Sequence, residues 1–305
     1  MNNTSNDNYR GYSEGGKRVS GSQRSAGQRS SGQRSEDQPP RRRRRKKKQS
    51  RALYYLILLV LLGILVFSAV KIISYFKQQA DASDAQQEIT DNYITPGTTP
   101  NSDGDSTGGG DDSSASPSTT DPDTITVDFN SMIADYPDVV GYIYCANTNL
   151  KNPIQYGKGN DYYLTHDSKG NTNNNGSIFM EAINSSSFSD GNTIIYGHNM
   201  KSGLMFADLT KYKDKSYYSS HPYIYIYTPS QNYRLDLYAG FVCEHNDEVY
   251  STSLTQDQLK AMAAKSTFVS NIGTPTGKTV TLSTCSYEFD NARYVVIGAL
   301  NPISN

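Results

Sequence analysis

The chain has 305 residues and a formal net charge of −1, with 29 Lys and Arg against 30 Asp and Glu. This balance hides an asymmetry: residues 1–51 carry 15 basic against 4 acidic side chains, and residues 52–305 carry 14 against 26, so the net charges are +11 and −12. Such an asymmetry points to a membrane or an acidic partner. Three cysteines are too few for a small disulfide-stapled scaffold.

The N-terminal tail, residues 1–51, is rich in Ser, Gly, Gln, Asn and Arg and poor in aliphatic residues. It cannot bury enough apolar surface to offset chain entropy, so it is predicted to be disordered. Arg41–Lys48 is a continuous basic run, of a kind that can bind nucleic acid. Because an apolar segment follows it directly, we interpret it as a cytoplasmic signal for membrane orientation that contacts anionic lipids, with no nucleic-acid partner.

Ala52–Val70 is 19 residues long without a charge, and apolar residues continue beyond Lys71 to Phe76. At ~1.5 Å per residue, this stretch reaches roughly 28 Å, the thickness of a bilayer core. It lacks the polar stripe of a globular helix, and no small-residue cleavage site follows it closely. The pattern predicts a transmembrane anchor over residues 52–76, with the N-terminus in the cytoplasm and the remainder outside the cell.

Residues 77–123 are predicted to be a flexible, acidic extracellular linker, since 80–123 contain 10 acidic residues and no Lys or Arg. The remaining residues, 124–305, are numerous enough for one domain with a hydrophobic core.

Within this domain a short helix is predicted at Asn130–Tyr136, ended by Pro137. A second helix begins with a capping box at Thr255–Gln258 and is predicted to end near Asn271 and Gly273. The rest is mainly β, which favours a barrel or a sandwich. The predicted strands are Val139–Cys145, Ser177–Met180, Thr193–Tyr196, Tyr223–Tyr227, Tyr233–Val242, Thr279–Leu282 and Arg293–Leu300.

Cys285 ends the run Thr279–Cys285, and Arg293 opens the next strand. If the two strands are neighbours, the thiol and the guanidinium meet at one end of the sheet, where the cation can stabilise a thiolate or an oxyanion. A cysteine taken in isolation is more simply a small buried core residue. A phosphatase loop is not predicted, because it needs five intervening residues, whereas seven separate this pair, including acidic Glu288 and Asp290.

A cysteine nucleophile needs a base or an imidazolium partner. His198 is the best candidate of the four histidines, because it follows a predicted strand through Gly197. The others, His166, His221 and His245, lie in polar or charged segments. No pair has close ligand spacing, so neither a metal nor a cofactor is predicted. The odd number of cysteines leaves at least one thiol free, while a disulfide between Cys145 and Cys243 stays open.

Thr281-Leu-Ser-Thr-Cys285 resembles the TLxTC signature of sortases, and Arg293, eight positions later, matches the arginine of that family. Tyr196-Gly-His198 is similar to the segment that holds its histidine. Three upstream stretches, 128–143, 160–166 and 204–209, resemble class B sortases, as does the helix near 255–265. The resemblance covers about residues 125–303. Cys145 departs from it, standing where an aliphatic residue is expected, and we interpret it as a small core residue.

The resemblance implies a sortase-type eight-stranded β-barrel with added helices and a cysteine transpeptidase activity. Cys285 would form a thioester, His198 would transfer protons and Arg293 would stabilise the oxyanion. Thr284 and Ser283 are assigned to substrate binding. The implied partners are surface proteins with a sorting signal, NPxTN-like or PxTG-like, and a cell-wall peptide precursor as the amine acceptor.

Two alternatives stay open. A pilin-polymerising sortase would typically carry a lid over the site and often a second membrane segment, and neither is evident in the sequence. An inactive, membrane-tethered binding module would be compatible with the anchor, but the joint presence of His198, Cys285 and Arg293 argues against it.

Overall fold

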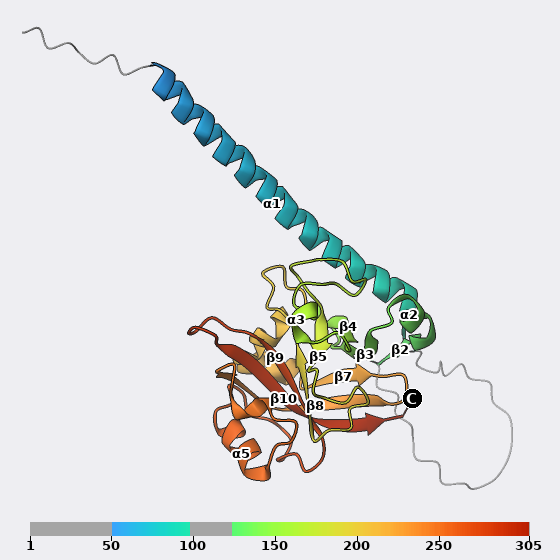
Figure 1. Ribbon diagram of the computed structural model, residues 1–305. Coiled ribbons are helices and arrows are strands. Elements are labelled where there is room, and N and C mark those ends of the chain that lie inside the picture. The colour runs from blue at the N-terminus through green and yellow to red at the C-terminus, as the bar shows by residue number, and fades with distance from the viewer. Residues whose placement is uncertain (1–50, 98–123, 305) are drawn as a thin grey trace, which may run out of the picture. The chain divides into compact units, whose positions relative to one another are not determined.

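The computed structural model describes residues 51–97 and 124–304, so most of the predicted basic tail and residues 98–123 of the predicted linker lie outside the described residues. The chain divides into two units, 1–57 and 58–305, and every contact discussed below lies within the second. Figure 1 shows the arrangement of the helices and strands.

The predicted anchor lies within one long helix, α1, Arg51–Tyr93. Its residues 52–76 are exposed throughout, and α1 is the one helix among the described residues that is long and apolar enough to cross a membrane. Membrane insertion would bury these exposed apolar side chains.

The structure corrects the start of the predicted linker. Residues 78–93 continue α1, and β1, Ile94–Pro96, follows immediately. The physical reason is a sparse apolar stripe, since Ala82, Ile89 and Tyr93 are buried within an otherwise acidic and polar stretch. The composition of this stretch therefore did not reveal that it forms a helix that packs against the following domain.

The two ends of the segment that lies outside the described residues meet. β1 pairs antiparallel with β2, Ile125–Val127, and the Gly97 amide donates a 2.9 Å hydrogen bond to the Thr124 carbonyl. The β1–β2 pair adjoins the domain, because the Ile125 amide donates to the Tyr227 hydroxyl at 3.0 Å.

Eight strands form a closed barrel in the order β10-β8-β7-β3-β4-β5-β6-β9, which confirms the predicted fold. Two neighbouring pairs, β4–β5 and β6–β9, are parallel, and the others are antiparallel. The strands are β3 Val139–Tyr144, β4 Lys151–Gln155, β5 Ile178–Met180, β6 Asn192–Tyr196, β7 Tyr223–Tyr227, β8 Asn232–Cys243, β9 Thr279–Cys285 and β10 Arg293–Ile303.

Short helices connect the strands: α2 Phe129–Asp135, α3 Asn160–Tyr163, η1 Ala207–Lys213, α4 Lys215–Ser220, η2 Glu248–Tyr250 and α5 Gln256–Ala264. The predicted capping box is confirmed at the start of α5, where Thr255 and Gln258 bond reciprocally. The helix ends at Ala264, well before Asn271, because the chain turns there to place Phe268 in the core. On α5, Leu259 and Met262 pack against the outer face of the β8–β10 sheet.

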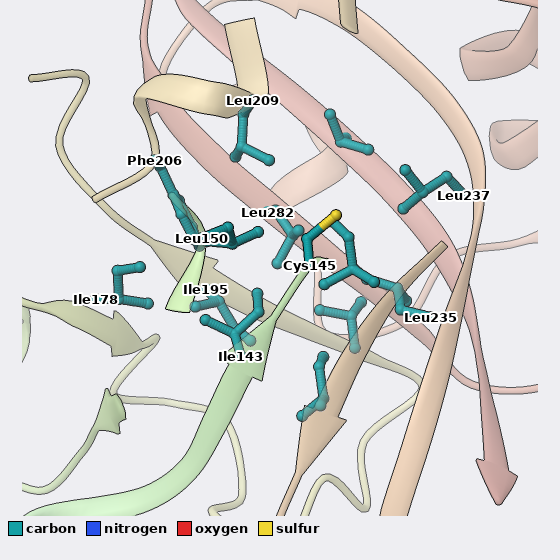
Figure 2. Packing of buried hydrophobic residues seen from close by; sticks show 14 of the residues in the cluster. Ile143, Cys145, Leu150, Ile178, Ile195, Phe206, Leu209, Leu235, Leu237 and Leu282 are labelled. Carbon is teal, nitrogen blue, oxygen red and sulfur yellow. The ribbon is translucent and has the colours of Figure 1, made fainter. Parts of the chain in front are cut away.

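The barrel interior is filled by aliphatic and aromatic side chains from most of its strands, including Ile143, Leu235 and Leu282 (Figure 2). Cys145 belongs to this cluster with 4% exposure, which confirms that it is a core residue. Cys243 lies instead in the outer cluster beneath α5. None of the three cysteines forms a disulfide, so Cys145 and Cys243 are not joined.

Candidate active site

Cys285 ends β9 and Arg293 begins β10, and the two residues are directly paired in the antiparallel ladder. Side chains of directly paired residues project from the same face of a sheet, so the thiol and the guanidinium share one face and one end of the barrel. On its other side Arg293 pairs with Cys243 of β8. The pairing of β10 with β9 and with β8 therefore places the arginine between two cysteines.

The two neighbouring thiols differ in access. Cys285 is partly exposed, whereas Cys243 is 5% exposed. Burial, followed by the charge of Asp247, raises the pKa of the Cys243 thiol to about 12. Cys243 therefore remains a protonated, inaccessible thiol. Since Cys145 is also buried, Cys285 is the accessible thiol of the three.

The segment that carries His198 is bound along the strand that carries Cys285. The Gly197 amide donates to the Ser283 carbonyl at 3.2 Å, and the Thr284 hydroxyl donates to the Gly197 carbonyl at 2.8 Å. One residue beyond His198, the Asn199 side-chain amide donates to the Cys285 carbonyl at 3.0 Å. These bonds extend the parallel β6–β9 ladder and bring His198 to the end of β9, where Cys285 lies.

The His198 ring is oriented by a backbone carbonyl. Its Nε2 lies 2.8 Å from the carbonyl oxygen of Leu164, at the end of the turn that follows α3. A carbonyl oxygen only accepts hydrogen bonds, so Nε2 carries a proton in this arrangement. The other nitrogen, Nδ1, is therefore the one that can exchange a proton with a reacting group.

Ser283 and Thr284, the two residues assigned to substrate binding, are 1% and 2% exposed. The hydroxyl of Ser283 is hydrogen bonded to that of Tyr250 at 2.9 Å, and Thr284 holds the Gly197 carbonyl. In this structure both side chains hold the strands and loops of the site together. Their contact with substrate stays a prediction.

The guanidinium of Arg293 bonds to its own turn, donating from Nη1 to the carbonyls of Asn291 at 3.2 Å and Ala292 at 3.1 Å. Within residues 51–97 and 124–304 it forms no ion pair with a carboxylate, so its charge is not neutralised there. Tyr196 and Tyr250 are partly buried, and this burial raises their pKa values, while the charge of Arg293 acts on both in the opposite direction. The positive charge therefore faces this aromatic pair on the outer side of the barrel.

A polar cluster fixes the turn that follows the cysteine. Lys213, at the end of η1, donates to the Ser286 hydroxyl at 2.8 Å and forms an ion pair with Glu288, to which Ser286 also donates. The Lys213 ammonium lies 5.2 Å from the centre of the Tyr294 ring. Sequence reasoning missed this cluster, because 72 residues or more separate Lys213 from its partners and no motif marks it.

The Glu288 carboxylate gives a pH-dependent prediction. Its bonds with Lys213 and Ser286 lower its pKa from 4.5 to about 2. A depressed folded-state pKa stabilises the fold fully above pH 4.5, and this contribution is lost as the pH falls towards 2. We therefore expect Glu288→Gln to lower the melting temperature by about 1–3 °C at pH 7, as for a partly exposed ion pair. The difference from wild type should vanish near pH 2 in thermal melts, and a difference independent of pH would contradict this origin.

Two of the other histidines have local partners. His166 stacks on Tyr162 at 4.0 Å, and His221 bonds through Nδ1 to the Tyr217 carbonyl at 3.1 Å. Among the described residues, no group of three or more His, Cys, Asp or Glu side chains is arranged to hold a metal ion.

Comparison with known proteins agrees with this geometry. A family model described as the Sortase domain matches residues 156–301, which include His198, Cys285 and Arg293. Sortase B of Listeria monocytogenes is 38% identical over 174 residues, 53% of this chain and 70% of that protein. Sortase B of Staphylococcus aureus is 30% identical over 184 residues, 58% of this chain and 75% of that protein.

Solved structures show the same fold. The sortase B of B. anthracis aligns with a TM-score of 0.57 and 25% identity, covering 76% of this chain and all of that one, 100%. The sortase B of Clostridium perfringens aligns with a TM-score of 0.52 and 28% identity, covering 57% and 99%. From the sequence relatives, the shared barrel and the paired cysteine and arginine, we conclude that this chain belongs to the class B sortases, a family of cysteine transpeptidases.

Proposed function

We propose that this sortase cleaves the sorting motif of a surface protein through a thioester on Cys285 and transfers the protein to an amine of a cell-wall peptide precursor. The observation that carries the proposal is the pairing of the accessible Cys285 with Arg293, beside the segment that holds His198. This arrangement supplies a nucleophile, a cation for the oxyanion and a proton carrier at one end of the barrel.

In the proposed reaction Cys285 gives its proton to Nδ1 of His198, and the resulting thiolate attacks the scissile carbonyl carbon, forming a C–S bond and an oxyanion. Arg293 stabilises this oxyanion once its guanidinium exchanges the carbonyls of its own turn for the substrate. The C–N bond then breaks, and His198 gives the proton on Nδ1 to the leaving amine. The acceptor amine attacks the thioester, His198 takes the proton back, and the Cys285 thiolate is released with a new amide bond in the product.

An amine acceptor is supported by a relative. One solved sortase B, with 29% identity and a TM-score of 0.54, is a complex with triglycine. The N-terminus of a short glycine peptide is a small, unhindered amine, and we propose an acceptor of this class. For the sorting signal we propose an NPxTN-like or a PxTG-like motif.

The test uses the full chain in detergent micelles with two peptide series, one for each motif, and triglycine as the acceptor. Mass spectrometry should show a ligated product for one series, and a thioester adduct when the acceptor is omitted. Transfer to a lysine side chain of a pilin-like peptide in preference to triglycine would favour the pilin-polymerising alternative. Binding of a peptide with neither cleavage nor adduct would contradict the enzyme and indicate a tethered binding module.

We also propose the membrane topology: residues 1–51 in the cytoplasm, 52–76 in the membrane and 124–305 as the extracellular catalytic domain. It is supported by the exposed apolar surface of α1 and by the charge asymmetry across it. Lipid contact by the basic run, which lies outside the described residues, belongs to the same proposal. In cells stripped of their wall, added protease should reach a C-terminal tag and leave an N-terminal tag intact, and the opposite result would reverse the orientation.

A further inference from the structure

The part of α1 beyond the apolar segment is docked on the catalytic domain. Ala82 and Ile89 are 7% and 3% exposed. The Gln86 side-chain amide donates to the carbonyls of Asn149 at 2.9 Å and Lys151 at 3.0 Å, and Glu88 pairs with Lys169 at 2.8 Å. Residues 78–93 are therefore held by both apolar and polar contacts.

A further contact is part-buried and reaches the backbone of the helix. The side-chain amide of Asn175, itself 4% exposed, donates to the main-chain carbonyl of Gln78 at 3.0 Å. Its neighbour Asn174 contacts the same helix residue, but through the exposed side-chain oxygen of Gln78, at 2.9 Å. The two asparagines thus form a part-buried and an exposed contact with one position of α1, only two residues beyond Phe76.

Asn175 is followed by a glycine that lies against the carbonyl which orients His198. Gly176 has a φ of +57°, and a Cβ built on it would stand 2.8 Å from the Leu164 oxygen and 2.5 Å from the Tyr163 oxygen. This close approach requires glycine. Ser177 continues the contact, because its amide donates to the Tyr163 carbonyl at 2.9 Å.

These contacts form a short chain: the Gln78 carbonyl, Asn175, Gly176, the Leu164 carbonyl and the Nε2 of His198. We propose that docking of α1 positions His198, with Asn175 as the positioning residue that transmits the contact. Docked α1 fixes the loop 164–177, the loop presents the Leu164 oxygen, and this oxygen keeps the proton of the neutral ring on Nε2. The catalytic consequence rests on the proposed role of His198, whereas the effect on the ring does not.

The test is the tautomer of His198, read from the imidazole ¹⁵N shifts of the full chain in detergent micelles, with His198→Gln to assign the signal. Wild type should show the Nε2–H form. Asn175→Ala should give a mixture of tautomers and lower kcat by about tenfold, a fraction of what general acid–base catalysis supplies, with KM little changed. Asn174→Ala, which loses only the exposed contact, should resemble wild type in both readouts.

A second matched pair of variants disturbs the docking of the helix and leaves the sequence of the loop unchanged. Ala82→Arg places a charge in the buried interface, while Ala80→Arg makes the same change at an exposed position two residues earlier. Only the first should alter the tautomer. Thermal melts identify a variant that has lost its fold. A wild-type tautomer in both folded Asn175→Ala and folded Ala82→Arg would overturn the inference, whereas full activity of His198→Gln would overturn the proposed catalytic role and leave the tautomer result standing.

Discussion

Replacement of Cys285 by alanine should lower peptide cleavage by roughly 10⁴-fold or more, the scale on which removal of a catalytic nucleophile acts. No other described thiol can take its place, because Cys145 and Cys243 are buried and burial raises the pKa of Cys243 to about 12. The barrel should stay folded, since Cys285 is the last, partly exposed residue of β9. Cleavage kinetics with a motif peptide, together with intact mass spectrometry for the thioester, would measure the effect.

The matched control is Cys243→Ala. This residue occupies the equivalent place on the other side of Arg293, so the substitution removes a thiol from the same row of the sheet. It should retain cleavage and the thioester adduct, with a modest loss of stability from the smaller side chain beneath α5. Turnover retained by Cys285→Ala but lost in a folded Cys243→Ala would transfer the nucleophile to β8 and contradict the proposed mechanism.

Arg293→Lys should lower turnover by roughly 10²-fold or more, as removal of an oxyanion-hole donor does. Lysine keeps the positive charge, but it lacks the planar set of donors that can hold a substrate carbonyl and an oxyanion together. The structure shows the guanidinium donating to two carbonyls from a single nitrogen. The proposed step requires these N–H donors to leave the two carbonyls and to bind the oxyanion of the substrate.

The rate of Cys285 alkylation as a function of pH separates charge from geometry in this variant. Because the charge is conserved, the alkylation profile of Arg293→Lys should follow that of wild type while turnover falls. A turnover near that of wild type would show that charge alone is sufficient. A large change in the alkylation profile would assign Arg293 to control of the thiolate, and its oxyanion role would be withdrawn.

The sequence predicted those elements whose pattern is local. Runs of β-branched and aromatic residues located β7 at its observed bounds and β9 at its observed start, and the capping box located the start of α5. β4 escaped prediction because Pro153 lies in it, and proline usually argues against a strand within a sheet. Pro153 pairs with Tyr142 of β3, and no local sequence pattern predicts this pairing.

The candidate site divides in the same way. Cys285, Arg293 and His198 could be proposed from the sequence because they stand at strand ends and match a family signature. Lys213 and Asn175 were missed because their importance arises from long-range contacts, to Glu288 and to Gln78. The helix in the first half of the predicted linker was also missed. Its three buried residues, Ala82, Ile89 and Tyr93, are too widely spaced in an acidic stretch to form a recognisable helical pattern.

The hydrogen bond between Gly97 and Thr124 argues against a spacer role for the acidic segment 98–123. A spacer increases the distance between the two segments that it joins, whereas Gly97 and Thr124, which flank residues 98–123, are hydrogen bonded to each other, so lengthening this segment would not move the domain away from α1. Doubling such a loop costs only ~0.6 kcal/mol in closure entropy. In the proposed membrane topology, the distance between the membrane and the active site therefore depends on α1 and not on the number of residues between Gly97 and Thr124.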